Sequence, residues 1–309
     1  MMLGHRSTRT AALAISIAAT ATMTGCSGPA EDTSPPAPEE SSGVEAPASY
    51  DVRAELRDVV SEVEKEFNVR AGVAVADREG TVNAGLRGEE PAWSTVKVPI
   101  AIAALRDGAS PELVDLAIKE SDNDAAYALW SHVRWSEGDA GSAVTALLEE
   151  YGSTGEFEEP FGYSTWLLED QAEFGAHLPC IPEAEQVYDA MDDIVEWQDN
   201  GLDKLPNTRA KGGWGLSEYD DGYTHRQIGV RETTPSGSSK ESTVGLAVEV
   251  TMPGEYAEEA IPALNVLAAG VDRVVTEALE AGALKPVEGC APPTATQTAG
   301  TTSARRFGS

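Results

Sequence analysis

The sequence predicts an α+β domain over residues 50–290, in which an antiparallel sheet is flanked by N- and C-terminal helices and carries an inserted helical lobe. The first observation is the order of patterns along the chain: one helix, two strands, a block of helices, further strands and a last helix. The second is that short turns join the expected strands, which favours antiparallel pairing. The third is that both ends of the domain contribute strands, so the helical middle forms a separate lobe with a cleft beside it.

The first part of the domain has clear periodicities. Over residues 51–67 apolar side chains recur at helical spacing, opposite a charged face. Residues 71–76 are small and apolar and predict a strand, and after a turn at 77–80 a second strand is expected over 82–86. The helical block follows, and its helices are expected at residues 93–105, 114–130, 140–151, 167–177 and 183–198.

The last part of the domain returns to the strand pattern. Residues 226–230 and 244–250 are rich in β-branched and apolar residues, and the Ser- and Gly-containing segment 236–239 predicts the turn between them. A closing helix is expected over 261–279. Pro262 falls in its first turn, where the missing N–H group costs little.

Both ends of the chain lie outside this domain. Residues 1–25 have a basic start and then small and apolar residues, which is typical of a targeting segment. Their last residues, Met-Thr-Gly, stand directly before Cys26 and resemble the lipobox of bacterial lipoproteins, with Met where Leu is usual. The resemblance implies that Cys26 is lipidated; an ordinary signal peptide with an incidental cysteine is the alternative. Residues 26–49, rich in Pro, Ser, Ala and Glu, predict a disordered tether, and residues 291–309 predict a disordered tail.

The charge of the chain excludes some partners. Lys and Arg number 22 against 52 Asp and Glu, so the formal net charge is −30. So acidic a surface repels phosphate backbones and anionic headgroups, which excludes nucleic-acid binding and attachment to a membrane through a basic patch. No apolar run reaches the ~20 residues of a membrane helix. Membrane contact is therefore expected through the lipid anchor only.

The two remaining cysteines and the histidines suggest no metal or cofactor. Cys180 and Cys290 are an even pair in an exported chain, so a disulfide between them is expected, two separate thiols being the alternative. Such a bridge would join the C-terminal end of the domain to its middle. The histidines have no metal-ligand spacing, and a Gly-rich phosphate loop is absent from the sequence.

Three short motifs stand in order within the domain. An S-x-x-K motif at 94–97 begins the first buried helix, an S-D-N motif occupies 121–123 in the second, and a K-G-G motif at 211–213 opens the late strands. Each alone has an ordinary explanation as a helix cap or a polar turn. The occurrence of all three motifs in this order is much harder to explain by chance.

The first motif has a plain chemical interpretation. Residues three apart on a helix share a face, so Ser94 and Lys97 can touch. The positive end of the helix dipole favours a developing alkoxide on Ser94, and a partly desolvated Lys97 has a lowered pKa and can take the hydroxyl proton. The surrounding helix is apolar nearly all round, so Lys97 is a charge amid buried surface and needs partners.

Together the motifs resemble those of the serine β-lactamase and penicillin-binding superfamily, most closely the class A β-lactamases. The resemblance covers about residues 50–282 and extends to the sequence on both sides of the first two motifs. The chain also resembles the lipoprotein branch of this superfamily in mycolate-forming actinobacteria. The resemblance implies a β-lactamase/transpeptidase-like fold, with Ser94 as the acyl-accepting nucleophile, Lys97 as its base and Ser121 as the proton relay to the leaving nitrogen.

The remaining roles also follow from the resemblance. Asn123 would bind the substrate amide, and Lys211 would face the substrate carboxylate on the strand that carries Gly213. The backbone N–H groups of Ser94 and Trp214 would form the oxyanion hole, where one donor is worth ~3–4 kcal/mol in acyl transfer.

The sequence departs from class A β-lactamases in three ways. The interval from Ser94 to Ser121 is about half as long as theirs, which makes the cleft more open and puts the approach of Ser121 to Ser94 in question. Gly212 replaces the middle hydroxyl of the third motif, a loss of about 1 kcal/mol or more in carboxylate binding. The glutamate that activates the deacylating water has no clear counterpart, and the segment between 151 and 163 offers the candidates Glu156, Glu158 and Glu159.

Two functions remain open at this point. The first is an exported, lipid-anchored serine hydrolase on the extracytoplasmic face of the cell membrane, acylated at Ser94 by β-lactams or D-Ala-D-Ala-like amides, with weak or no efficient β-lactam hydrolysis. Its partners would be small molecules or cell-wall peptide. The second is a catalytically silent envelope lipoprotein that uses the same fold for binding.

Overall fold

The fold is built on one antiparallel sheet with helices on both faces. The computed structural model describes residues 50–217, 222–234, 242–254 and 260–289. The predicted signal peptide, Cys26, the tether, Cys290, the tail and the turn at 236–239 lie outside these residues. The strands are β1 (Arg70–Asp77), β2 (Gly80–Gly85), β3 (Thr208–Leu216), β4 (Gly222–Thr233), β5 (Ser242–Pro253) and β6 (Val287–Glu288). They follow the order β2-β1-β5-β4-β3, and β6 pairs with β5.

Eight α-helices and several short 3-10 turns complete the described part of the chain. The α-helices are α1 (Val52–Phe67), α2 (Lys97–Arg106), α3 (Pro111–Lys119), α4 (Asn123–Glu137), α5 (Ala140–Glu149), α6 (Leu168–His177), α7 (Glu185–Ala190) and α8 (Ile261–Glu280). The 3-10 turns are η1 (Trp93–Val96), η2 (Phe161–Tyr163), η3 (Leu178–Cys180), η4 (Pro182–Ala184), η5 (Glu196–Gln198) and η6 (Gly201–Lys204). No helix in these residues has the length and apolar character needed to cross a bilayer.

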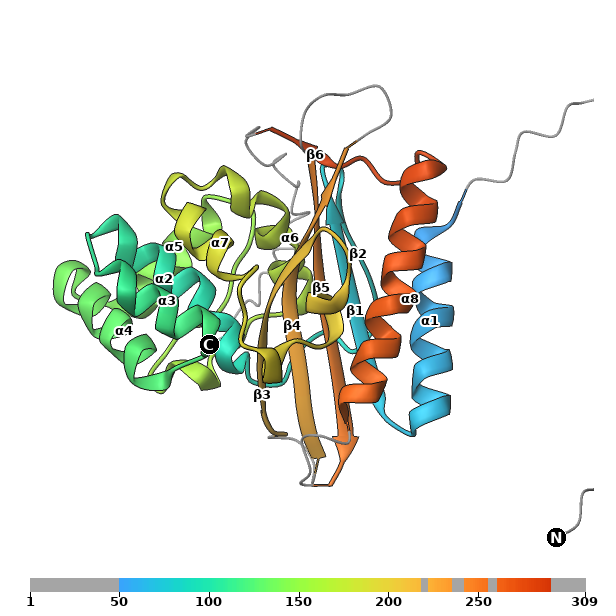
Figure 1. The fold of residues 1–309 in the computed structure, drawn as a ribbon, viewed down its shortest axis with the longest axis horizontal. Coiled ribbons are helices and arrows are strands. Elements are labelled where there is room, and N and C mark those ends of the chain that lie inside the picture. The colour runs from blue at the N-terminus through green and yellow to red at the C-terminus, as the bar shows by residue number, and fades with distance from the viewer. Residues whose placement is uncertain (1–49, 218–221, 235–241, 255–259, 290–309) are drawn as a thin grey trace, which may run out of the picture. The chain divides into compact units, whose positions relative to one another are not determined.

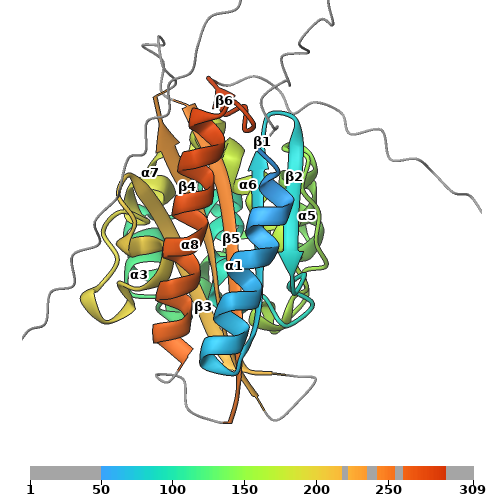
Figure 2. The same cartoon turned by 90° about the vertical axis from the view of Figure 1, so that its right-hand side faces the viewer.

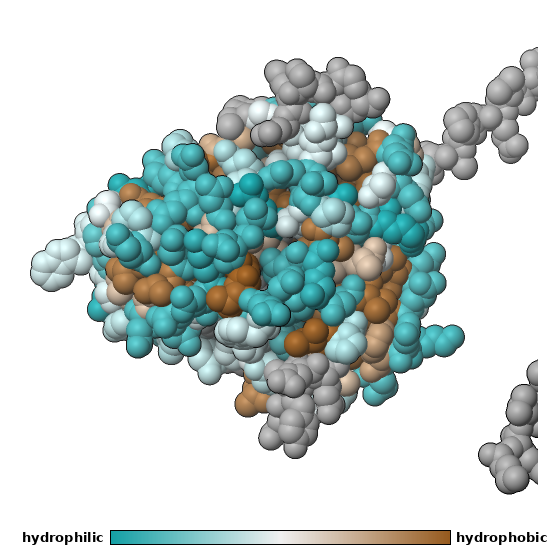
Figure 3. Space-filling view, viewed as in Figure 1, coloured by the Kyte–Doolittle hydropathy of each residue, from teal (hydrophilic) through white to brown (hydrophobic). Residues whose placement is uncertain are grey.

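The sheet separates two helical layers. Helices α1 and α8 lie side by side on one face, while α6 packs on the other and leads into the lobe of α2 to α5 and α7 (Figures 1 and 2). The predicted α+β architecture with flanking terminal helices and an inserted helical lobe is therefore confirmed. The surface seen in Figure 3 is largely hydrophilic with smaller hydrophobic areas, in keeping with the many charged residues.

The first helix illustrates how the sequence determines an element. Asp51 accepts a hydrogen bond from the N–H of Ala54 at 3.0 Å and so satisfies an end of α1 that would otherwise lack a partner. The apolar stripe that includes Leu56 and Val63 is buried against α8 and the sheet. The helix ends at Phe67, and the next residue, Asn68, adopts a left-handed φ of 53°.

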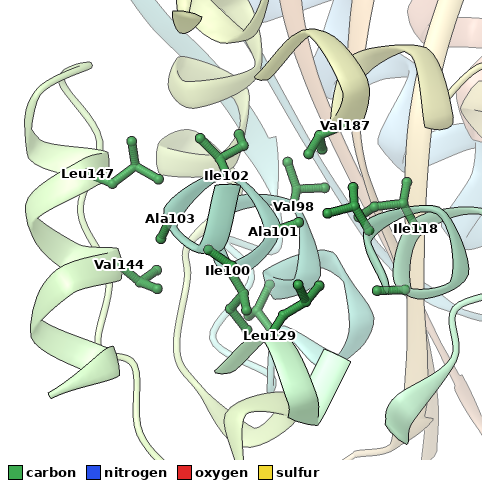
Figure 4. Close-up of a cluster of buried hydrophobic side chains, with 14 of the residues drawn as sticks. Val98, Ile100, Ala101, Ile102, Ala103, Ile118, Leu129, Val144, Leu147 and Val187 are labelled. Carbon is green, nitrogen blue, oxygen red and sulfur yellow. The ribbon is translucent and has the colours of Figure 1, made fainter. Parts of the chain in front are cut away.

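The helical lobe has its own core around α2. Figure 4 shows Val98, Ile100 and Ile102 of α2 surrounded by apolar side chains of neighbouring helices, among them Ile118, Leu129, Val144, Leu147 and Val187. Each fully buried aliphatic side chain of this kind contributes ~1.5–3 kcal/mol. Helix α2 is thus held on all sides, and this fixes the position of the S-x-x-K motif at its start.

Two predicted helices were wrong in extent. The helix expected over 114–130 is two helices, because the Asp122 carboxylate caps α4 by accepting from the N–H of Ala125 at 2.7 Å. The helix expected over 183–198 is reduced to α7 with flanking 3-10 turns. There the N–H of Val195 donates to the carbonyl of Lys119 at 3.2 Å, a tertiary bond that competes with continued helix. The short strand β6 had no predicted counterpart.

Candidate active site

The S-x-x-K motif lies where a 3-10 turn passes into a helix. Ser94 is half-buried in η1, and Lys97 is the first residue of α2. Only 1% of Lys97 is exposed, so its charge is held in the core of the lobe. A buried ammonium requires hydrogen-bond acceptors, because burial without them is strongly unfavourable.

The S-D-N motif supplies those acceptors. The Nζ atom of Lys97 donates to the carbonyl of Ser121 at 2.6 Å and to Oδ1 of Asn123 at 2.7 Å. Longer contacts reach Ser121 Oγ at 3.4 Å and the Asp122 carbonyl at 3.3 Å. Burial lowers the pKa of Lys97 to about 8, and the Asp122 carboxylate opposes this shift.

The third motif approaches the same hydroxyl from the sheet. Lys211 on β3 is fully buried, and its Nζ donates to Ser121 Oγ at 3.0 Å, to the Gly212 carbonyl at 2.8 Å and to Gln198 Oε1 at 3.4 Å. Burial first, and then the charge of Lys97, lower the pKa of Lys211 to about 7, while Asp203 opposes the shift. All three motifs therefore meet at Ser121.

Two residues at this junction have left-handed backbone. Ser121 has φ 55° in the break between α3 and α4, and Trp93, directly before Ser94, has φ 50°. Such a conformation costs a residue with a side chain of the order of 1–3 kcal/mol and persists when the surroundings hold it. The N–H of Asp122 donates to the Leu116 carbonyl at 3.0 Å, which helps to hold the Ser121 turn.

Gly213 allows the sheet to approach the Ser94 turn closely. A Cβ atom at this position would lie 2.6 Å from the backbone nitrogen of Ser94 and 2.9 Å from that of Thr95. Only glycine therefore fits without displacement of β3 or η1. The close approach puts the Ser94 amide beside the residue that precedes Trp214, whose amide is the other predicted oxyanion donor.

These groups border a cavity of about 600 Å³. Ser94, Ser121 and Asn123 line it together with six aromatic side chains, namely Trp93, Tyr127, Phe161, Tyr163, Trp197 and Trp214. Lys97 and Lys211 lie beneath its floor and do not line it. The short interval between the first two motifs thus does not keep Ser121 from the cavity that holds Ser94.

The expected side-chain hydrogen bond between Ser94 Oγ and Lys97 Nζ is absent from the described residues, although the backbone N–H of Lys97 donates to the Ser94 carbonyl. The ammonium of Lys97 turns to the four oxygen atoms of the 121–123 turn instead. Catalytic hydrogen bonds are often long without substrate and tighten in the reacting complex. The absence of this bond without substrate therefore does not exclude proton transfer between the two side chains.

The structure separates the three candidate glutamates. Glu159 lines the cavity of Ser94, whereas Glu156 and Glu158 line another cavity of about 510 Å³. Glu159 Oε2 accepts from Arg134 at 3.0 Å, with both side chains about half exposed. Sequence spacing had not separated the three, because they lie in one irregular segment without periodicity.

Two further residues of the site were missed by the sequence analysis. Gln198 is buried and accepts from Lys211, and the partly buried Asp203 lies close enough to Lys211 for their charges to interact. Burial raises the pKa of Asp203 well above its ordinary value. No group of three or more His, Cys, Asp or Glu within the described ranges is arranged to hold a metal ion.

Comparison by sequence finds neither a matching family model nor a similar curated protein. Solved structures are similar in fold. A class A β-lactamase from Bacteroides cellulosilyticus has a TM-score of 0.57 at 15% identity, over 73% of this chain and 99% of that one. A variant of the last common ancestor of Gram-negative class A β-lactamases has a TM-score of 0.51 at 23% identity, and the match covers 72% of this chain and 97% of that one. A β-lactamase from Burkholderia vietnamiensis has a TM-score of 0.53 at 17% identity, and this match also covers 72% of this chain and 97% of that one.

The matching region includes nearly the whole of those enzymes, and the fraction of this chain that it leaves out is about one quarter. At these identities the likeness concerns the fold and not the reaction. This chain has the fold of the class A β-lactamases.

Proposed function

We propose that this protein is a serine hydrolase that is acylated at Ser94. The observation that carries the proposal is the convergence of two buried lysines with lowered pKa on the hydroxyl of Ser121, in the wall of the cavity that Ser94 lines. Clusters of such perturbed groups are typical of catalytic sites.

The reaction uses groups of this chain alone. Ser94 Oγ attacks the carbonyl carbon of an amide or ester, and Lys97 in its neutral form takes the hydroxyl proton. Ser121, held by Lys211, passes its proton to the leaving atom as the bond from carbon to that atom breaks, and takes in its place the proton that Lys97 received from Ser94. The backbone N–H groups of Ser94 and Trp214 stabilise the oxyanion, each by ~3–4 kcal/mol.

Release of the acyl group is the slow stage in this proposal. Glu159 is the acid of the cavity and the candidate base for the hydrolytic water. Its carboxylate is paired with Arg134 at 3.0 Å, so one of its oxygen atoms is already engaged by a hydrogen-bond donor. We therefore propose weak turnover of β-lactams, with an acyl-enzyme that persists.

The test is mass spectrometry of the intact protein after incubation with a penicillin. A mass increase equal to the whole penicillin is expected on the native chain and not on Ser94→Ala. An equal adduct on both proteins, or none on the native one, would falsify acylation at Ser94.

We also propose export and lipid anchoring through Cys26 to the extracytoplasmic face of the membrane, on the pattern of residues 1–49. Incorporation of labelled palmitate into the native chain, lost in Cys26→Ser, is the expected result. Label retained by that variant would contradict the proposal. We further propose that the chain belongs to the lipoprotein branch of the β-lactamase superfamily in mycolate-forming actinobacteria, on the sequence resemblance described above.

A silent binding protein remains the second candidate function. It is favoured by the lack, within the described residues, of a hydrogen bond between the Ser94 hydroxyl and Lys97 Nζ, and by the ion pair of Glu159. It predicts that Ser94→Ala supports the cellular role as well as the native chain does. Loss of that role in the variant would speak for the hydrolase.

A further inference from the structure

The charges of the site point to the kind of substrate that it accepts. The cavity beside Ser94 is lined by twelve residues, and Glu159, an acid, is the one charged side chain among them. No cation of the lining faces a ligand there. With a formal net charge of −30, the whole chain repels anions from the cavity as well.

The lysines beneath the cavity have no donors to spare. An ammonium has three N–H groups, and those of Lys211 are directed to Ser121, Gln198 and Gly212. Those of Lys97 are directed to the 121–123 turn. The expected contact of Lys211 with a substrate carboxylate would require one of these bonds to break, in a residue that has no exposed surface.

The strand position next to Lys211 adds no donor. Gly212 has no hydroxyl, and Gln227, directly opposite on β4, has its amide engaged. The Gln227 Nε2 donates to the Asn200 carbonyl at 2.9 Å and lies 3.3 Å from an oxygen of Asp203, while its Oε1 accepts from Leu202 N at 2.7 Å. The amide of Gln227 is therefore engaged by Asn200, Leu202 and Asp203 and is not available to a substrate carboxylate.

A second cavity of about 500 Å³ adjoins the first across Trp197 and Trp214, which line both. Arg226 borders it, but its guanidinium is fully buried and directed elsewhere. It donates to the carbonyls of Glu90, at 2.7 Å, and Trp166, at 2.8 Å, and lies 3.5 Å from Glu249. This arginine is therefore a poor partner for a ligand in either cavity.

The apolar lining suits an uncharged group. Trp197 is 65% exposed, Tyr163 49% and Tyr127 47%, all at the cavity of Ser94. Exposed aromatic rings around a concavity bind apolar and aromatic surface, and this is where most of the ligand contact area in such sites comes from.

From these observations we propose that the site accepts uncharged acyl donors, esters or amides with an apolar or aromatic acyl group, in preference to donors that carry a carboxylate. This rests on the proposed acylation of Ser94. The bond from Ser94 Oγ to the acyl carbon forms, the bond to the leaving oxygen or nitrogen breaks, and the Ser94 proton ends on the leaving atom.

The test compares benzylpenicillin with its methyl ester, which differ in the carboxylate alone. The rate of Ser94 acylation by each is measured on the full chain by intact-protein mass spectrometry, with Ser94→Ala as the blank. The ester is expected to react about tenfold faster, because the acid would have to place a carboxylate in a cavity whose lining offers no cation. An adduct of the whole molecule identifies attack on the lactam, because attack on the ester group releases methanol.

The outcomes separate the two proposals. If benzylpenicillin reacts as fast as its methyl ester or faster, the preference for uncharged donors is overturned, but acylation of Ser94 is still supported. If neither compound forms an adduct, acylation of Ser94 itself is overturned. Gly212→Ser sharpens the test, since a Cβ there would lie 3.8 Å from the nearest side-chain atom, that of Trp214, and fits. The hydroxyl introduced by Gly212→Ser is expected to raise the rate of acylation by benzylpenicillin relative to that by the methyl ester. Gly212→Ala adds no hydroxyl and is expected to leave this ratio unchanged. An equal ratio in the two variants would overturn the role given to Gly212.

Discussion

Replacing Gly213 by alanine tests the geometry of the site most directly. The added Cβ would lie 2.6 Å from the Ser94 nitrogen, 2.9 Å from the Thr95 nitrogen and 3.0 Å from the Ala92 carbonyl. All three are backbone atoms, so no flexible side chain can move aside, and β3 must shift from η1. Overpacking of this kind costs ~1–3 kcal/mol of stability.

The effect on the reaction is expected to exceed the effect on folding. A shift of β3 moves the amide of Trp214 relative to that of Ser94, and loss of one oxyanion donor lowers the rate ~100- to 1000-fold. Gly212→Ala is the matched control, because its Cβ would have no atom nearer than 3.8 Å. Acylation rate and thermal unfolding are measured on both variants. Native acylation by Gly213→Ala, or an equal loss in Gly212→Ala, would refute the assigned geometry.

Three further predictions concern other contacts. Because burial lowers the pKa of Lys211 to about 7, the unfolded chain binds more protons than the folded one above that pH. The free energy of unfolding is therefore expected to rise with pH from about 7 towards 10. Thermal unfolding is expected to show a smaller rise in Lys211→Met. Arg134→Ala frees Glu159 and is expected to speed loss of the acyl group from Ser94, while unfolding shifts by less than ~1 kcal/mol; unchanged acyl lifetime would argue against Glu159 as the base. The Cys180 Sγ lies 3.2 Å from the carbonyl of Gly289, so a disulfide to Cys290 is expected, and thiol alkylation before and after reduction detects it.

The predictable part of the fold lay in its periodic segments. Helix α1 begins and ends within one residue of its expected range, since its apolar stripe and its Asp51 cap agree. The long helix expected over 114–130 failed because an apolar pattern continues across the break, and the capping carboxylate of Asp122 decides the local structure.

The site was predictable only in part, because some of its contacts are made by irregular segments. Motif order allowed Ser94, Ser121 and Lys211 to be expected in one region, and the cavity and hydrogen bonds bring them there. Spacing could not reveal that Gln198 reaches Lys211, since that contact depends on the irregular path after α7. Contacts made by irregular segments leave no periodic trace in a sequence.

The hydroxyl of Ser121 also ties the two halves of the domain together. One of its lysine neighbours belongs to the helical lobe and the other to the sheet. A mutation that removed it would leave two like charges facing each other without their common neighbour, and would weaken the seam as well as the chemistry.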